Sequence, residues 1–148
     1  MSDSGSSLVD ALSRLPVYRG FTWRAAGFEL TAPFSSDAPI PTTRDLRVAT
    51  ENFRAVGVHL ILSTGGRDIG PFSAHPSDQE VVLLPGARLV PATSFHEVAG
   101  LRIQVVIEQP RSEEPIPDVP TDAEIGEIIL AAQAKDDVAV FSPGRYGA

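Results

Sequence analysis

Residues 73–86 read SAHPSDQEVVLLPG: an acidic pair, an apolar run and a Pro-Gly turn in succession. Side chains two positions apart in a strand point to the same face of the sheet. If a strand begins near Asp78, the carboxylates of Asp78 and Glu80 therefore converge at one edge of a sheet. The pair is then either a solvated strand end or the working end of an active site.

The composition is that of one folded domain. The chain has 148 residues, of which 43% are hydrophobic and 21% charged, enough for a single buried core. Its net charge of −7 argues against binding nucleic acid or an anionic membrane, because both need a basic face. We therefore expect no nucleic-acid and no membrane partner. The absence of cysteine excludes disulfides, thiolate chemistry and cysteine-based zinc sites, and we expect no metal.

The chain divides into three parts. Residues 1–7, MSDSGSS, are expected to be disordered and lack the regions of a signal peptide. Residues 8–109 hold the patterns of the core. Residues 110–148 begin with PRSEEPIPDVP, which has four prolines and three acidic residues, and continue into a helix. That helix either packs on the core, as we expect, or belongs to a partner interface. The chain is compatible with one domain of a longer protein.

Hydrophobic periodicity predicts the main elements. Apolar residues at every second position predict strands at 56–63 and 101–108, with TGGRDIG (64–70) as a turn-rich connector. A capping box at Thr121–Glu124 predicts a helix over 121–137. The other predicted elements are a helix starting at Ser7, a helix at 44–53, strands at 17–23 and 28–34, and strands at 79–84 and 87–91 around the turn Pro85-Gly86.

Three motifs occur in a characteristic order: VYRG (17–20), TTRDLRVATENF (42–53) and GRDIGPFSAHPSDQEVVLLPGARL (66–89). From about Leu15 to Glu108 the chain resembles the mono-ADP-ribosyltransferase family, in its arginine–serine–glutamate branch. The resemblance implies an α+β fold: a mixed β-sandwich core of two small sheets, a few flanking helices and a cleft for NAD, which is a substrate of the family.

The resemblance implies a role for Arg19 and Gly20. In the family, the strand arginine contacts the phosphates and ribose of NAD, and a guanidinium fork suits a pyrophosphate. The glycine lets the dinucleotide approach the backbone. Without the other motifs, Arg19 would be read as an exposed strand residue beside a glycine bulge.

The family's serine motif, which braces the site, matches two places. Counting back from the helix places it at Thr42 and Thr43, which we prefer, because helix spacing varies less than loop length. Counting forward from Phe34 places it at Ser35–Ser36. A plain N-cap role for Thr43 is a third interpretation.

Glu80 matches the family's catalytic glutamate, which precedes a V-x-L-x-P strand. A carboxylate there stabilises the positive charge that develops on the ribose as nicotinamide leaves. The alternative is an edge-strand glutamate facing water. Asp78 matches the residue that helps to choose or activate the acceptor, usually glutamate or glutamine, and is one methylene shorter. By the same resemblance, three further residues lie in the loop that contacts the acceptor: Ser73, His75 and Ser77. His59 is expected to have a structural role.

The function implied is an NAD-consuming mono-ADP-ribosyltransferase. It would cleave the nicotinamide–ribose bond and transfer ADP-ribose to a protein side chain, with arginine one candidate. The alternatives are an NAD glycohydrolase toxin, a catalytically degenerate module of the same fold that binds NAD or a protein, and an unrelated small β-rich interaction domain. Expected partners are NAD, a target protein and an immunity or carrier protein. Delivery as a secreted effector domain is expected, with the cytoplasm as the alternative.

Overall fold

The computed structural model of the protein describes residues 3–147. Its elements follow one another in this order: α1 (Asp3–Ser13), β1 (Val17–Ala25), β2 (Phe34–Ser35), β3 (Ile40–Thr43), α2 (Leu46–Thr50), β4 (Gly57–Asp68), the 3₁₀ turns η1 (Gly70–Phe72) and η2 (Pro76–Asp78), β5 (Glu80–Leu83), β6 (Arg88–Pro91), β7 (His96–Val98), β8 (Leu101–Glu108) and α3 (Asp122–Gln133). None of the helices in this described range is long and apolar enough to span a membrane.

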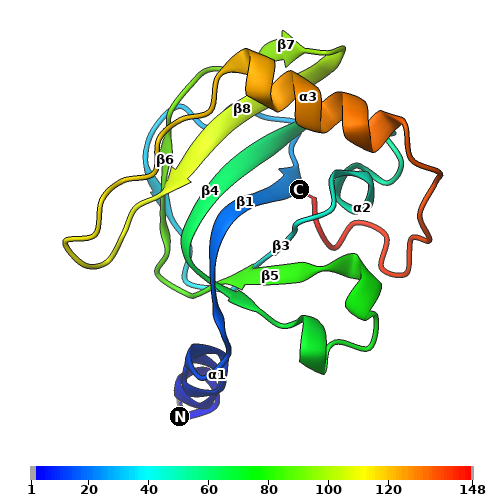
Figure 1. The fold of residues 1–148 in the computed structure, drawn as a ribbon. Coiled ribbons are helices and arrows are strands. Elements are labelled where there is room, and N and C mark those ends of the chain that lie inside the picture. Colours follow the sequence, from blue (N-terminus) through cyan, green and yellow to red (C-terminus); the bar gives the residue numbers. More distant parts are fainter. Residues whose placement is uncertain (1–2, 148) are drawn as a thin grey trace.

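The strands form one strongly curved, mixed sheet (Figure 1). Its order is β1-β3-β5-β4-β8-β6-β2, and β1 also pairs with β4, so that β1, β3, β5 and β4 close into a ring. Strand β4 runs antiparallel to β1 and parallel to β8, and its last two residues, Arg67 and Asp68, pair with β5. The two small sheets that we expected are therefore joined through β4 into one sheet. The predicted α+β class is confirmed.

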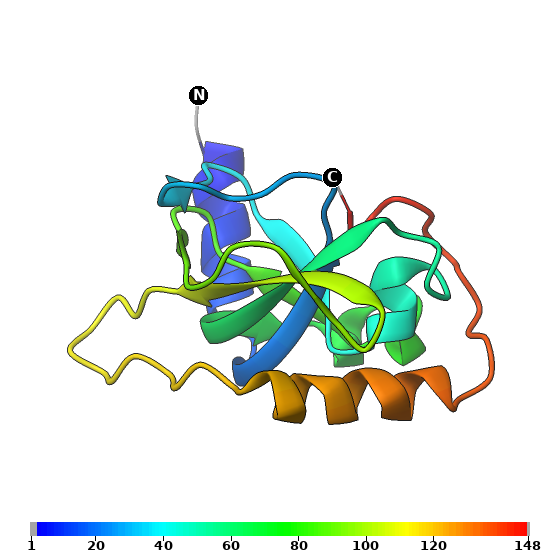
Figure 2. The same cartoon turned by 90° about the horizontal axis from the view of Figure 1, so that it is seen from above.

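Both faces of β4 are buried because the sheet is covered on each side. Leu60 and Leu62 belong to one apolar cluster with Trp23, and Ile61 belongs to another. Helix α3 lies along the first face, across β4 and β8 (Figures 1 and 2). It contributes Ile125 and Ile129, both 0% exposed. Burying an isoleucine side chain contributes roughly 1.5–3 kcal/mol, so these two residues tie the helix to the sheet.

The strands predicted from alternation at 17–23, 56–63 and 101–108 are confirmed as β1, β4 and β8. The capping box is also confirmed, since the Thr121 hydroxyl accepts a hydrogen bond from the Glu124 N–H at 3.2 Å. Helix α1 begins at Asp3, earlier than the predicted start at Ser7, so residues 3–7 are not the disordered stretch that we expected. Residues 1 and 2 lie outside the described range.

Two local predictions are wrong. Of the strand predicted at 28–34, only Phe34 lies in β2. The Gln104 side chain binds both backbone groups of Leu30, at 2.9 and 2.7 Å, in place of a neighbouring strand. Helix α2 ends at Thr50 and not at Phe53, because residues 51–53 all have positive φ.

The connector predicted at 64–70 is largely strand, whereas the strands predicted on either side of Pro85-Gly86 are confirmed as β5 and β6. Strand β4 continues through residues 64–68, which we read as a connector, because the Glu108 carboxylate accepts hydrogen bonds from the Thr64 and Gly65 N–H groups at 2.8 and 3.0 Å. Strands β5 and β6 flank the turn Pro85-Gly86 without pairing with each other. Strand β5 pairs with β3 and β4, whereas β6 pairs with β2 and β8, so the turn carries the chain from one part of the sheet to the other.

Candidate active site

The two carboxylates of the acidic pair are buried side by side at the start of β5. Asp78 is 4% exposed and Glu80 is 3% exposed. We expected both residues to lie on one strand, and this is wrong. Strand β5 begins only at Glu80, whereas Asp78 is the last residue of the turn η2. Gln79 between them is left-handed, with φ +51°. The convergence of the two side chains therefore results from this turn and not from strand alternation.

Strand β3 places the preferred serine-motif residues beside this pair. The Thr43 backbone pairs with Glu80, and its hydroxyl donates to the Asp78 carbonyl. The Thr42 hydroxyl donates to the Val81 carbonyl at 2.6 Å. Both threonines are fully buried and brace the loop that carries the acidic pair.

The competing interpretations of the serine motif fit the structure less well. The N-cap of α2 is Asp45, whose carboxylate accepts the Arg47 N–H at 2.9 Å, so Thr43 is not the capping residue. Ser35 lies in β2, which pairs with β6, and Ser36 bonds Ala38 locally. Neither serine contacts the acidic pair through any bond described in residues 3–147.

Two residues that the sequence analysis did not single out, Arg145 and Tyr146, bind the carboxylates of the acidic pair. The Arg145 guanidinium donates from Nε to Glu80 Oε1 and from Nη2 to Glu80 Oε2, both at 2.7 Å. The Tyr146 hydroxyl lies 2.7 Å from Glu80 Oε1 and 3.1 Å from Asp78 Oδ2. One phenolic proton therefore faces two carboxylates. The hydrogen bond to Glu80 raises the pKa of Arg145, and burial, followed by the bond to Glu80, raises the pKa of Tyr146.

The backbone around these two residues is attached to the end of β1. The Ala25 N–H donates to the Tyr146 carbonyl at 2.7 Å, and Arg24 donates to the Gly147 carbonyl at 2.9 Å. Figure 1 shows the chain passing from α3 around α2 to reach this point. Residues 142–147 read SPGRYG, and a turn followed by Arg-Tyr is the only local signal of this contact.

Arg19 lies opposite an irregularity in β4. Tyr18 pairs with Gly66 and Gly20 pairs with Ser63, so one residue of β1 faces two of β4, which is a β-bulge. Gly20 has φ +151°, a conformation that residues with a side chain rarely adopt, so this position favours glycine.

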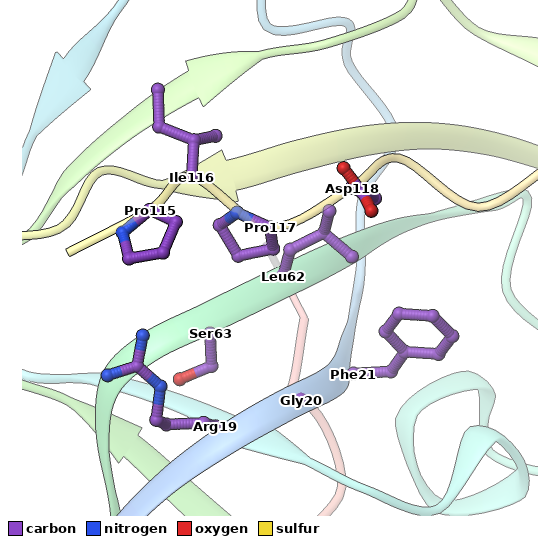
Figure 3. Close-up of a pocket in the computed structure, with 9 residues that line it drawn as sticks. All are labelled: Arg19, Gly20, Phe21, Leu62, Ser63, Pro115, Ile116, Pro117 and Asp118. Carbon is purple, nitrogen blue, oxygen red and sulfur yellow. The ribbon is translucent and has the colours of Figure 1, made fainter.

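A pocket of about 420 Å³ adjoins Arg19, lined by Gly20 and Ser63 and covered by residues 115–118 (Figure 3). Such a volume is in the range of small-molecule sites. The Arg19 side chain is 46% exposed and pairs with Glu114, and no contact or pocket described within residues 3–147 joins it directly to Glu80.

The other residues that the sequence analysis named, in the acceptor loop and at His59, have no described hydrogen bond to the carboxylates of the acidic pair within residues 3–147. His75 stacks on Phe141, with ring centroids 4.1 Å apart, and the Ser73 hydroxyl accepts the His75 N–H at 3.0 Å. Ser77 belongs to η2. His59 is packed between Phe28 and Phe95, and burial lowers its pKa, in line with the expected structural role.

Solved structures of bacterial enzymes share this arrangement of elements. ADP-ribosyltransferase Vis matches with a TM-score of 0.58 and 17% identity, over 75% of this chain and 58% of that one. HopU1 of Pseudomonas syringae pv. Tomato matches with a TM-score of 0.55 and 20% identity, over 70% and 49%. The chain has an ADP-ribosyltransferase-like fold.

A third structure with this fold is exoenzyme S from Pseudomonas aeruginosa, solved with human 14-3-3 protein beta and bound to carba-NAD. It matches with a TM-score of 0.53 and 15% identity, over 74% of this chain and 59% of that one. The chain thus spans between about half and three fifths of the length of these ADP-ribosyltransferases. Neither the models of protein families nor the curated proteins include a match to its sequence.

Proposed function

We propose that the protein is an NAD-consuming mono-ADP-ribosyltransferase in which Glu80 is the catalytic carboxylate. The observation that carries this proposal is a buried pair of carboxylates, Asp78 and Glu80, braced by Thr42 and Thr43 within an ADP-ribosyltransferase-like fold. Burying a carboxylate costs free energy unless it is paired, and two carboxylates are buried side by side at this place. Its position at the start of β5 supports a role in chemistry.

In the proposed reaction the bond between nicotinamide and C1′ of the ribose breaks, and its electron pair leaves with nicotinamide. Glu80 stabilises the positive charge on the ribose, as carboxylates do in glycoside hydrolysis. The nucleophile then attacks C1′ and loses its proton. Arg19, with its exposed guanidinium and the adjoining pocket, is proposed to hold the NAD phosphates, with Gly20 allowing close approach. The segment that carries Glu114 has to move for Arg19 to do so.

The acceptor that we propose is a guanidinium group on a target protein. Arg145 supports this proposal, because a guanidinium already binds Glu80 in the structure. The structure of Vis in complex with agmatine, which also carries a guanidinium, points the same way. Exoenzyme S in complex with 14-3-3 is a precedent for a protein partner. Delivery to another cell and an immunity or carrier protein remain predictions.

The test is release of nicotinamide from NAD by the purified protein and by two variants. Glu80→Gln keeps the size and removes the charge, and the rate should fall about 10²–10³-fold, as for other transition-state electrostatic contacts. Glu97→Gln is the matched control, because Glu97 is an exposed glutamate of β7, and it should keep the wild-type rate. Equal and measurable rates of nicotinamide release in wild type and Glu80→Gln would refute the assignment.

The same preparations separate transfer from hydrolysis. ADP-ribose attached to a protein or to a small guanidine compound is measured by mass, and free ADP-ribose is measured in the supernatant. Free ADP-ribose alone would identify an NAD glycohydrolase. Binding of NAD without any nicotinamide release, in wild type and in the variants described below, would identify a binding module of the same fold.

A further inference from the structure

We propose that residues 142–147, the Arg145 segment, are an internal inhibitor that occupies the candidate catalytic site and has to leave before NAD can use Glu80. This inference rests on the proposed function, since it assigns regulation to the same site. In the folded protein, Arg145 and Tyr146 bind Glu80 at the position that the substrate would take.

The Glu80 carboxylate is not accessible to a substrate in this state. Oε1 accepts from Arg145 Nε and from the Tyr146 hydroxyl, and Oε2 accepts from Arg145 Nη2, each at 2.7 Å. A carboxylate offers about four acceptor positions. With three of them filled and only 3% of Glu80 exposed, a ribose hydroxyl cannot reach the group.

The charge of Glu80 is also compensated. Arg145 forms a bidentate ion pair with it, the strongest geometry that an arginine and a carboxylate adopt. A carboxylate paired in this way stabilises a positively charged ribose poorly, because its field is already neutralised. The segment therefore blocks Glu80 both sterically and electrostatically.

The segment is attached in a way that suits release. Its bonds to the body outside the acidic pair are few: Arg24 and Ala25 hold the backbone of residues 145–147, and Glu51 accepts the Gly144 N–H at 2.7 Å. It contains no helix and forms only an isolated bridge with Ala25. The Arg145 side chain is 44% exposed, so water and competing groups reach it. Tyr146 is the only buried side chain of the segment, at 5% exposed, so opening has to expose this one side chain.

The segment before it is fixed more firmly. Arg47 donates to the carbonyls of Ala132 and Gln133, at 2.7 and 3.1 Å, and binds Asp137 at 2.9 Å. Asn52 binds both backbone groups of Val138, at 3.0 and 2.8 Å. Residues up to 138 thus stay anchored when the Arg145 segment leaves, so it remains close enough to rebind.

The direct test compares NAD affinity, by isothermal titration, in wild type, Arg145→Ala and Tyr146→Phe. Because apparent affinity is reduced by the fraction of open molecules, Arg145→Ala should bind NAD about 10- to 100-fold more tightly, and release nicotinamide faster. Tyr146→Phe removes only one of the three bonds to Glu80 and should shift affinity less, in the same direction. Arg88→Ala, which removes an exposed arginine of β6, is the matched control and should bind NAD as wild type does.

A peptide supplied in trans provides a second readout. Labelled SPGRYG peptide should bind the Arg145→Ala protein, measured by fluorescence anisotropy, and should compete with NAD. A peptide with alanine in place of the arginine should do neither. Adding Glu80→Gln to the Arg145→Ala protein should weaken binding of SPGRYG, because the ion pair is lost.

The outcomes separate the two proposals. If Arg145→Ala gains NAD affinity and binds SPGRYG but no variant releases nicotinamide, the inhibitor is supported and the catalytic assignment fails. Wild-type NAD affinity in Arg145→Ala, with no competition by SPGRYG, would overturn the inhibitor, whether or not nicotinamide is released. Tyr146→Phe keeps the test decisive if Arg145→Ala does not fold.

Discussion

Among the single residues of the site, Glu80 has the most hydrogen-bonding partners in the acidic pair. It binds the side chains of Arg145 and Tyr146, which follow it by 65 and 66 residues in the sequence. Asp78 has a different environment. Its carboxylate has one described hydrogen-bonding partner, the Tyr146 hydroxyl at 3.1 Å. Glu80 thus carries the charge compensation in the folded protein, and Asp78 is the carboxylate with spare capacity for an acceptor.

We therefore predict that Asp78→Asn separates transfer from NAD cleavage. The substitution keeps the size and removes the charge, so transfer to a guanidine acceptor should fall roughly 10- to 100-fold, the loss of one hydrogen bond to a charged group. Nicotinamide release into water should be nearly unchanged. Both activities are measured on one preparation, with exposed Asp37→Asn as the control. Abolition of hydrolysis in Asp78→Asn, as complete as in Glu80→Gln, would contradict this division of roles.

Arg19 provides a second prediction at this scale. Arg19→Lys keeps the charge and loses the planar fork that suits a pyrophosphate, so NAD binding should weaken by about tenfold. Titration calorimetry on the Arg145→Ala background measures this with the site open, and Arg88→Lys is the matched control. Equal affinity in Arg19→Lys and its parent would mean that Arg19 does not contact NAD.

Among the secondary-structure elements, strand β4 connects the two parts of the sheet. The bulge in this strand is followed by Gly66, where a side chain would not fit. A Cβ at Gly66 would lie 2.5 Å from Ser63 Oγ and 2.7 Å from Val81 Cγ1, closer than real contacts. Ser63 is held in place by the Glu108 carboxylate, which it reaches at 3.1 Å. The side chains of Ser63 and of the buried Val81 therefore have to shift to admit a side chain at this position.

We predict that Gly66→Ala lowers the free energy of unfolding by about 1–3 kcal/mol, the usual cost of overpacking. Gly27→Ala is the matched control, because a Cβ there meets nothing within 4 Å. That variant should be neutral or slightly more stable, since alanine restricts the unfolded chain. Urea unfolding of both variants measures the difference. A Gly66→Ala protein as stable as wild type would show that β4 adapts at the bulge.

The stability of the whole molecule should depend on pH through His59. This residue is 7% exposed, and burial lowers its pKa, with nearby Arg24 acting in the same direction. The unfolded chain then binds the proton more readily than the folded protein, so stability falls as the pH drops below about 6.5 and levels off below the folded pKa. His96, whose pKa is raised by bonds to Ser94 and Asp122, opposes this trend weakly because the pair is exposed.

The measurement is the free energy of unfolding between pH 7.5 and pH 5 in wild type and His59→Gln. Wild type should lose more stability over this range, because the variant has no imidazole to protonate. Parallel curves for the two proteins would show that His59 accepts a proton in the folded state without cost.

The amino-acid sequence by itself determined the elements whose signals are local. Apolar alternation specifies β1, β4 and β8, and the Thr121 capping box specifies the start of α3, because these patterns depend on neighbours a few positions apart. The motif around Glu80 likewise identified the acidic pair and the strand that follows it.

Only the tertiary structure decided how these parts meet. The length of β4 depends on the Glu108 carboxylate, which is 44 residues from Thr64, and Asp78 and Glu80 converge through the left-handed turn at Gln79. Arg145 reaches Glu80 because α3 packs on the sheet and Arg47 and Asn52 direct the following chain around α2. Contacts between residues so far apart depend on the packing of the entire chain, and no local pattern of apolar or polar residues encodes them.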